Sequence, residues 1–197
     1  MKTVSFMKMD DATPEDMQLI KDEAARHRAQ NWLPTILGLL DGLKGNRFGY
    51  QVDRYTHSLQ TATRAWHEGA RTDMVVAALL HDMADDLSTD NHSEVAAAIL
   101  RSVLDDEAVW VVQHHGVFQT YHYGPKLGLP ADTRERYRGS PYFDACAHFC
   151  AAWDQMSFDP DYETYPLDFF MPMLEEVFNR PPKVWGDPNL APTGANT

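Results

Sequence analysis

The chain has 197 residues, of which 44% are apolar and 23% charged, so it is long enough for one domain with a sizeable core. Its formal net charge of −12 argues against sequence-independent binding to nucleic acid or to anionic lipid, which needs clustered Lys and Arg. The N-terminal residues carry no apolar segment typical of a signal peptide, and no apolar run approaches membrane-spanning length. We therefore expect a cytoplasmic protein that acts on a small molecule and binds neither nucleic acid nor a membrane.

Helical patterns follow one another along the chain, and no segment alternates as a strand would. Thr13 can cap a first helix, which begins at Pro14 and runs to about Gln30. The further predicted helices cover 33–44, 53–67, 73–85, 91–104, 105–115, a short segment at 132–136, 140–155 and 167–179. Residues 180–197 are rich in Pro and Gly and are expected to form an extended tail. With no repeat and no internal linker, the sequence predicts one all-α domain over 1–197.

The predicted helix 73–85 ends in a histidine and an aspartate. Seven apolar residues, Met74–Leu80, lead directly into His81 and Asp82. A helix that is apolar on every side is typical of the centre of a bundle. An unpaired carboxylate is costly in such a place, so Asp82 needs a compensating partner. The structural alternative is a core histidine with a hydrogen-bond partner beside an aspartate that ends the helix.

A second carboxylate is also predicted to face inward. Asp154 follows Cys146 and Cys150 at intervals of four residues and so extends the apolar face of helix 140–155. The alternative is an aspartate that turns into the following loop at the helix C-terminus, where the helix dipole disfavours a negative charge.

Histidines recur at helix ends and on inner faces. His57 lies in the third predicted helix, His92 in the first turn of the fifth, and His114 and His115 at the end of the sixth. His114 or His115 individually could be structural, because a helix dipole favours histidine near a C-terminus. Imidazoles together with carboxylates suit Zn, Fe or Mn ions. A divalent cation would compensate the buried carboxylates, and one carboxylate can bridge two ions. Position alone does not choose between His114 and His115.

The order His57, His81-Asp82, Asp154 on a helical chain resembles the HD superfamily of metal-dependent enzymes. Residues 57–62, HSLQTA, are similar to the opening of the small mixed-valent diiron HD oxygenases, the group that includes 2-amino-1-hydroxyethylphosphonate dioxygenase and myo-inositol oxygenase. Residues 152–154, AWD, look like the segment of that group that carries its last ligand. The resemblance implies an HD-type helical bundle with its core at about 50–179. It also implies two metal ions, as Fe(II)/Fe(III), held by His57, His81, Asp82, His92, His115 and Asp154, with Asp82 as the bridge.

The resemblance implies an enzyme that cleaves a small hydroxylated, phosphonate-like or polyol-like substrate with O₂. The alternative within the superfamily is a phosphohydrolase of a nucleotide or another phosphate ester, and a third hypothesis is a helical binding module without metal. The phosphonate enzymes have His-Asp-x-Gly-His where this chain has HDMAD at 81–85, and a lysine where it has Gln119. The residues predicted to contact the substrate or to support the ligands are Arg54, Asp85, His114, Gln119 and Tyr121.

Overall fold

A computed structural model describes residues 2–183, and within this range the protein consists of seven α-helices and short helical turns, with no strand. The predicted all-α class is confirmed. The chain divides into two compact units, Met1–Leu37 and Gly38–Thr197. The sequence did not predict this division, and a single domain over 1–197 stays a prediction. Most of the predicted tail, residues 184–197, lies outside the described residues.

A single helix, α1 (Pro14–Gly42), replaces the two helices predicted at 14–30 and 33–44. Polar side chains near the expected break bond back along the helix. The amide of Asn31 donates to the carbonyl of His27, and the hydroxyl of Thr35 donates to the carbonyl of Asn31. Such bonds satisfy the side chains without ending the helix, so no turn forms between residues 30 and 33.

The start of α1 is capped as predicted. The hydroxyl of Thr13 accepts from the backbone N–H of Asp16 at 3.2 Å, and the Asp16 carboxylate accepts from the N–H of Thr13 at 3.1 Å. The same carboxylate accepts from the backbone N–H and the hydroxyl of Ser5, both at 2.8 Å. The bonds from Ser5, followed by those from Thr13, hold the pKa of Asp16 well below its usual range.

Replacing Asp16 with asparagine should therefore speed amide hydrogen exchange in the first turn of α1 at pH 7. A carboxylate whose pKa is lowered on folding stabilises the folded form above its unfolded pKa of about 3.9, and this contribution is lost as the pH falls. The difference between the wild type and Asp16→Asn should thus shrink from pH 5 to pH 2. Asp22→Asn is the matched control, because within the described part of the chain Asp22 accepts only from the exposed Gln18 side chain. Equal exchange in the two variants at pH 7 would contradict the prediction.

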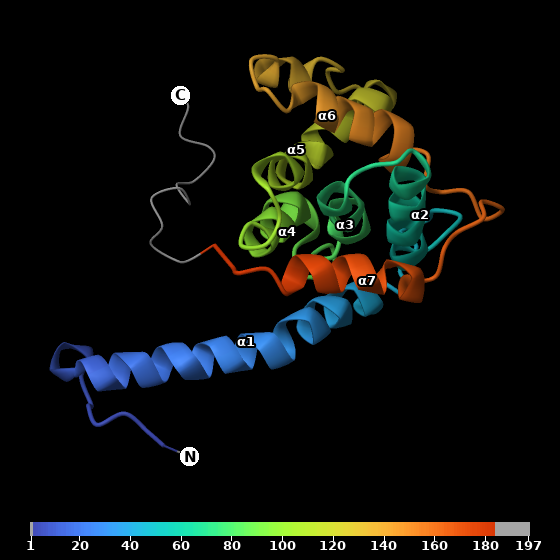
Figure 1. The fold of residues 1–197 in the computed structure, drawn as a ribbon. Coiled ribbons are helices and arrows are strands. Elements are labelled where there is room, and N and C mark those ends of the chain that lie inside the picture. The colour runs from blue at the N-terminus through green and yellow to red at the C-terminus, as the bar shows by residue number, and fades with distance from the viewer. Residues whose placement is uncertain (1, 184–197) are drawn as a thin grey trace. The chain divides into compact units, whose positions relative to one another are not determined.

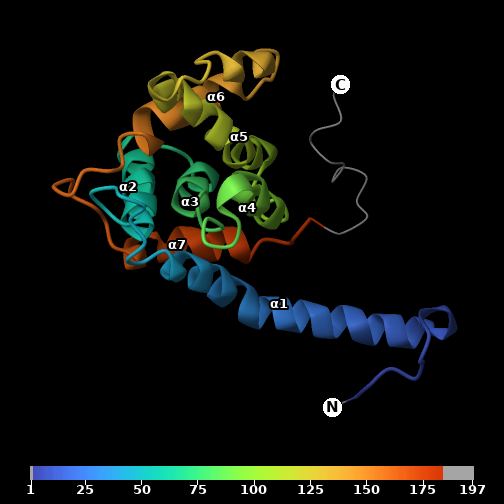
Figure 2. The same ribbon diagram turned by 180° about the vertical axis from the view of Figure 1, so that it is seen from behind.

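The second unit is built around α3 (Thr72–Leu80), every residue of which except Thr72 is buried. This helix packs against α2 (Arg54–His67), α5 (Asp106–Tyr123) and α7 (Leu167–Phe178), as Figures 1 and 2 show from opposite sides. α4 (His92–Leu100) and α6 (Phe143–His148) pack on α5. The predicted central position of the helix that begins near Asp73 is thereby confirmed.

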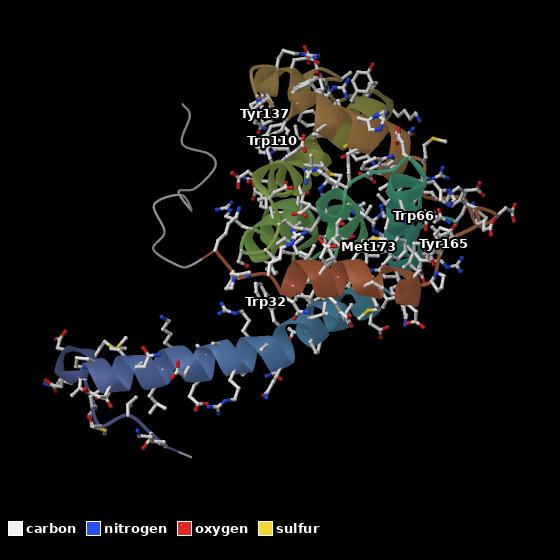
Figure 3. The ribbon with its side chains drawn as sticks, viewed as in Figure 1. Trp32, Trp66, Trp110, Tyr137, Tyr165 and Met173 are labelled. Carbon is white, nitrogen blue, oxygen red and sulfur yellow. The ribbon has the colours of Figure 1, made fainter. Side chains whose placement is uncertain are left out.

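Aromatic contacts tie peripheral segments to this core (Figure 3). The rings of Trp66 on α2 and Tyr165, just before α7, meet edge to face with centroids 5.3 Å apart. The rings of Trp110 on α5 and Tyr137, in the short helix η4 (Thr133–Tyr137), lie 6.0 Å apart. η4 corresponds to the short helix predicted at 132–136. Among the described helices, none combines the length and the apolar character needed to cross a bilayer.

Two helix ends differ from the prediction in ways that position polar side chains. α3 ends at Leu80 instead of Asp85, and the chain continues in tighter turns, with the N–H of Asp85 bonded to the carbonyl of Asp82 three residues earlier at 2.9 Å. α5 does not end near His115 but continues through Gly116 to Tyr123. A single glycine costs a helix only about 1 kcal/mol, and close packing against α4 explains its presence there, as described below.

The helix predicted at 140–155 begins at Phe143 and changes character halfway. α6 passes into a π-helical turn, η5 (Phe149–Asp154), in which the N–H of Gln155 bonds to the carbonyl of Cys150 five residues earlier at 3.1 Å. A π-helical turn is wider than an α-helical one and is frequent at functional sites. Here it ends at Asp154, whose carboxylate is buried in the interior.

Candidate metal centre

Six imidazole and carboxylate side chains from five parts of the second unit converge on one point. α2 supplies His57, the turn after α3 supplies His81 and Asp82, and the first residue of α4 is His92. Five of the six are fully or almost fully buried, whereas the His92 side chain is 21% exposed. The converging residues are His57, His81, Asp82, His92, His115 and Asp154.

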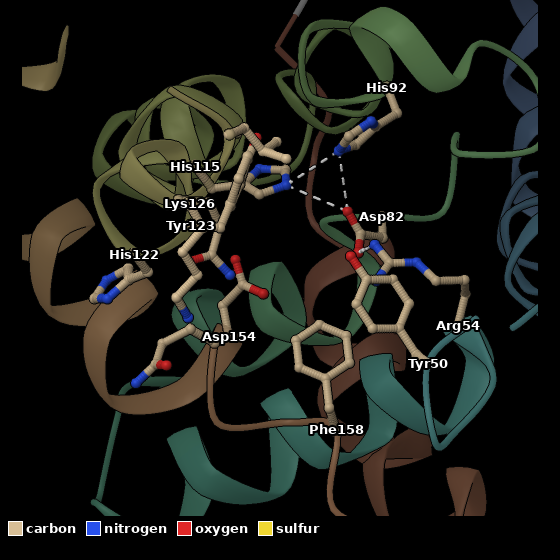
Figure 4. A pocket seen from close by; sticks show the side chains of 14 residues that line it. Tyr50, Arg54, Asp82, His92, His115, His122, Tyr123, Lys126, Asp154 and Phe158 are labelled. Atoms are coloured by element: carbon tan, nitrogen blue, oxygen red, sulfur yellow. Dashed lines mark hydrogen bonds and ion pairs between the residues drawn. The ribbon is translucent and has the colours of Figure 1, made fainter. Parts of the chain in front are cut away.

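The two carboxylate oxygens of Asp82 face different pairs of imidazoles, and Figure 4 shows the pair formed by His92 and His115. Its Oδ2 lies 3.3 Å from Nε2 of His57 and 3.1 Å from Nε2 of His81. Its Oδ1 lies 3.2 Å from Nε2 of both His92 and His115. Asp154 joins the first pair, because its Oδ1 lies 3.2 Å from Nε2 of His57. The cluster thus consists of two donor sets that share one carboxylate.

All four imidazoles are oriented by their other ring nitrogen. Each Nδ1 lies 2.7–2.9 Å from a backbone carbonyl oxygen. The acceptor is Ser157 for His57, Ala78 for His81, Thr89 for His92 and Val112 for His115. A carbonyl oxygen can only accept, so each Nδ1 carries the proton. In the neutral ring the lone pair is then on Nε2, the atom that faces the cluster. This is the arrangement that fixes histidines as metal ligands.

The spacing of these atoms fits metal ions. Two ligands of one ion are about 3.0–3.4 Å apart when each is about 2.1 Å from it. Nε2 of His57 lies 3.2 Å from Nε2 of His81, and Nε2 of His92 lies 3.3 Å from Nε2 of His115. Lone pairs at such distances repel unless a cation or a proton lies between them. Oδ2 of Asp154 is in addition buried and has no hydrogen-bond partner among residues 2–183. The donors present therefore suit divalent metal ions.

Arg54 and Asp85 support this cluster from the side. The Arg54 guanidinium bonds to Oδ2 of Asp82, and its Nε donates to Oδ2 of Asp85 at 3.0 Å. Oδ1 of Asp85 lies 3.5 Å from Nδ1 of His92. Burial disfavours the charged form of Asp82, but Arg54, the adjacent imidazole of His81 and hydrogen bonds from other imidazoles outweigh it and hold the pKa of Asp82 well below its usual range. Asp82 is therefore an ionised carboxylate, the form that binds metal.

The negative charge of the cluster also favours the protonated form of His92. Burial opposes protonation of His92, but the hydrogen bond to the Asp82 carboxylate outweighs it and raises the pKa of His92 to about 9. Without a metal ion, a proton takes its place at this imidazole. Protons and metal ions therefore compete for the same nitrogen.

The structure separates His114 from His115. Nε2 of His115 faces Asp82, whereas the His114 ring stacks on Trp110 with centroids 4.0 Å apart and its Nδ1 donates to the Trp110 carbonyl. Tyr121, expected near the substrate, is 47% exposed and lies under the Arg134 guanidinium, 3.7 Å from it. Consecutive residues of a helix point about 100° apart, which explains why His114 and Tyr121 face away from the cluster.

A cavity of about 640 Å³ opens beside the second donor set. Asp82, His92, His115 and Asp154 border it, and so does Gln119, which the sequence had indicated. Other lining residues were not anticipated, including Tyr50, His122, Lys126 and Phe158. The sequence does contain a signal for two of them, because His122 and Lys126 continue the helical spacing of His115 and Gln119. Tyr50 and Phe158 lie 108 positions apart in the sequence and stack with ring centroids 4.5 Å apart, a contact no local pattern reveals.

Gly116, next to His115, determines how closely α5 approaches α4. A Cβ at this position would lie 2.8 Å from the hydroxyl oxygen of Ser93, the neighbour of His92. We expect Gly116→Ala to lower the free energy of unfolding by about 1 kcal/mol, because overpacking costs about 1–3 kcal/mol and alanine regains about 1 kcal/mol of helix propensity. It should also weaken metal binding at His92 and His115. The double variant Ser93→Ala/Gly116→Ala should recover both properties. Chemical denaturation and metal titration measure them, and a double variant no better than Gly116→Ala would contradict the explanation.

Comparison with known proteins agrees with this geometry. The sequence profile of the HD domain matches residues 54–157, just over half of the chain. The matched segment runs from Arg54 to Ser157 and so contains all six converging residues. No curated protein matches the sequence significantly. HD domains are generally metal-dependent phosphohydrolases, and the His and Asp groups found here are of the kind that holds metal ions. The chain therefore belongs to the HD-domain family, a family of metal-dependent enzymes.

Proposed function

We propose that the protein is a dinuclear iron oxygenase that cleaves a small hydroxylated substrate with O₂. The observation that carries the proposal is the position of Asp82, whose two oxygens each face a separate pair of imidazole nitrogens. Such a carboxylate can bridge two ions. The preference for iron and O₂ is supported by the resemblance of residues 57–62 and 152–154 to the diiron HD oxygenases.

The two donor sets would have different roles. His57, His81 and Asp154, with Oδ2 of Asp82, offer four ligand atoms in a buried position. The second set has Oδ1 of Asp82 and two imidazoles, those of His92 and His115, and it borders the cavity. Catalytic metal sites keep coordination positions open for substrate. We therefore assign substrate binding to the second set. Two bound irons would supply electrons and a binding site for O₂.

The surrounding residues orient the ligands and exclude water. The ring of Phe158 stacks on that of His57 with centroids 4.5 Å apart, and Tyr50 covers Phe158 from the other side. Phe158 thus covers the His57 ring of the first donor set, whereas Asp154 of the same set borders the cavity. Arg54 keeps Asp82 ionised and holds the carboxylates of Asp82 and Asp85 in place by hydrogen bonds. A substrate hydroxyl at the second set would meet His92, the most exposed of the proposed ligands.

A phosphohydrolase is the second candidate, favoured by the activity that HD domains generally have. The same bridging carboxylate would hold two divalent ions close enough to clamp a phosphoryl group and to lower the pKa of a bound water. The ligand set is identical for both reactions, so metal identity and the co-substrate separate the two candidates.

The test is metal analysis combined with EPR spectroscopy on protein purified from iron-supplemented cells. An oxygenase should contain about two irons per chain and should give a mixed-valent Fe(II)/Fe(III) signal after partial reduction. The signal should change when a hydroxyphosphonate or a polyol is added, with O₂ uptake. Zn or Mn, with no mixed-valent signal and with phosphate release from a nucleotide panel, would replace this proposal by the phosphohydrolase. Failure to bind any metal would indicate a helical binding module.

A further inference from the structure

The wall of the cavity formed by α5 carries a row of polar side chains that leads away from the metal centre. Starting at His115, intervals of four, three and four residues give Gln119, His122 and Lys126, and all of these border the cavity. These intervals keep side chains on one face of a helix. The 3₁₀ turn η3 (Gly124–Leu127) follows α5 without a break and carries Lys126. At about 1.5 Å per residue, His122 lies about 10 Å beyond His115 along the helix.

Two atoms of this row are buried and lack partners within the described part of the chain. They are Oε1 of Gln119 and Nε2 of His122. Buried polar atoms in proteins are nearly always hydrogen-bonded. Both residues that carry these unpartnered atoms border the cavity, so their side chains are suited to bind a ligand there. Burial, followed by the nearby charge of Arg134, lowers the pKa of His122. Its neutral ring can accept or donate a hydrogen bond to a hydroxyl group.

Lys126 at the outer end of the row is exposed and has no carboxylate partner among the described residues. Lys44 and Lys183, in contrast, are paired with Asp41 and Asp106. Figure 4 shows Lys126 and Tyr123 on the side of the cavity where His115 lies, opposite Tyr50 and Phe158. A free ammonium group is thus available at this wall of the cavity, in a chain whose net charge is −12.

We propose that Gln119, His122 and Lys126 form a recognition row for a polyol that ends in an anionic group, a carboxylate or a phosphate. The anion would pair with Lys126, hydroxyl groups along the chain would bond to Gln119 and His122, and the reacting hydroxyl would lie at His92 and His115. The inference rests on the proposed function, because the metal centre defines the reacting end. A two-carbon substrate at the metals is too short to reach His122.

Binding to the iron-loaded protein under anaerobic conditions tests the row. Calorimetric titration would compare D-glucitol with D-gluconate and D-glucitol 6-phosphate, so that the neutral, carboxylate and phosphate ends are matched in chain length. We expect one of the two anions to bind about three- to tenfold more tightly than D-glucitol. Lys126→Met should remove this preference and leave D-glucitol binding unchanged. Gln119→Leu and His122→Leu should weaken all three. The preference should also decrease as salt is added.

Lys183→Met is the matched control, because it removes the same charge near the start of α5, where Lys183 pairs with Asp106. If Lys126→Met still binds the anion more tightly than D-glucitol, or if Lys183→Met loses this preference equally, the proposed role of the recognition row is refuted. Metal content is measured in the same samples. If the protein contains iron and gives a mixed-valent signal but shows no Lys126-dependent preference for the anion, the recognition row is refuted and the proposed oxygenase stands. Lys126-dependent anion binding by protein that holds no iron would instead support the row and refute the proposed oxygenase.

Discussion

Asp82→Asn should abolish tight binding of both metal ions and reduce turnover at least about 10³-fold, which corresponds to about 4 kcal/mol of activation free energy. The reason is that each oxygen of Asp82 faces one of the two donor sets. An asparagine amide offers one weak oxygen ligand and no negative charge. Asp154→Asn should have a narrower effect, because Asp154 belongs to the buried set alone, and should leave one ion per chain.

Asp86→Asn is the control for the loss of charge. Asp86 is exposed, lies four residues after Asp82 and bonds to the side chain of Asn46. This variant should keep two ions and full activity. Circular dichroism establishes that each variant is folded, and mass spectrometry of the native protein counts the ions. Two tightly bound ions in folded Asp82→Asn, or the same loss in Asp86→Asn, would refute the bridging role.

Removal of the metal ions should lower the melting temperature of the wild type by about 8–16 °C for each ion lost. An ion present at about 1,000 times its Kd stabilises the folded state by about 4 kcal/mol, and 1 kcal/mol shifts the melting temperature of a chain of this size by about 2–4 °C. The metal-free protein should nevertheless stay folded. Arg54 neutralises part of the charge of Asp82, and a proton on the His92 imidazole replaces part of the charge of the ions.

Thermal unfolding with and without a chelator, followed by anaerobic addition of Fe(II), measures this effect. The shift should be absent in Asp82→Asn and retained in Asp86→Asn. In Asp154→Asn about half of it should remain. A wild-type melting temperature that does not respond to chelation or to added metal would show that the cluster is a structural hydrogen-bond network.

The sequence was sufficient where a property depends on which residues are apolar. The uninterrupted apolar run Met74–Leu80 predicted the buried central helix, and it also predicted that the carboxylate of Asp82 needs a partner. The interval from Cys150 to Asp154 predicted a second inward carboxylate, which is buried in the structure. Burial follows from hydrophobic patterning because it depends only on which face of an element is apolar.

The sequence was insufficient where the helical repeat changes. The ideal period of 3.6 residues applies neither to the tight turns after Leu80 nor to the wide turn at Phe149–Asp154. These two departures orient Asp82 and Asp154. Gly116 predicted a helix end, because a glycine costs helix stability, but the structure uses it for close contact with Ser93. Local propensity was outweighed by packing between α4 and α5.

The sequence by itself determined the all-helical class, the buried carboxylates and a set of histidines with a resemblance to HD enzymes. Only the tertiary structure decided that His115 and not His114 faces Asp82, that the donors form two sets, and that Gln119, His122 and Lys126 share one cavity wall. The physical reason is distance. A metal centre and its cavity depend on a few ångströms between atoms from separate helices, and the order of residues along one chain does not specify those separations until the helices have packed.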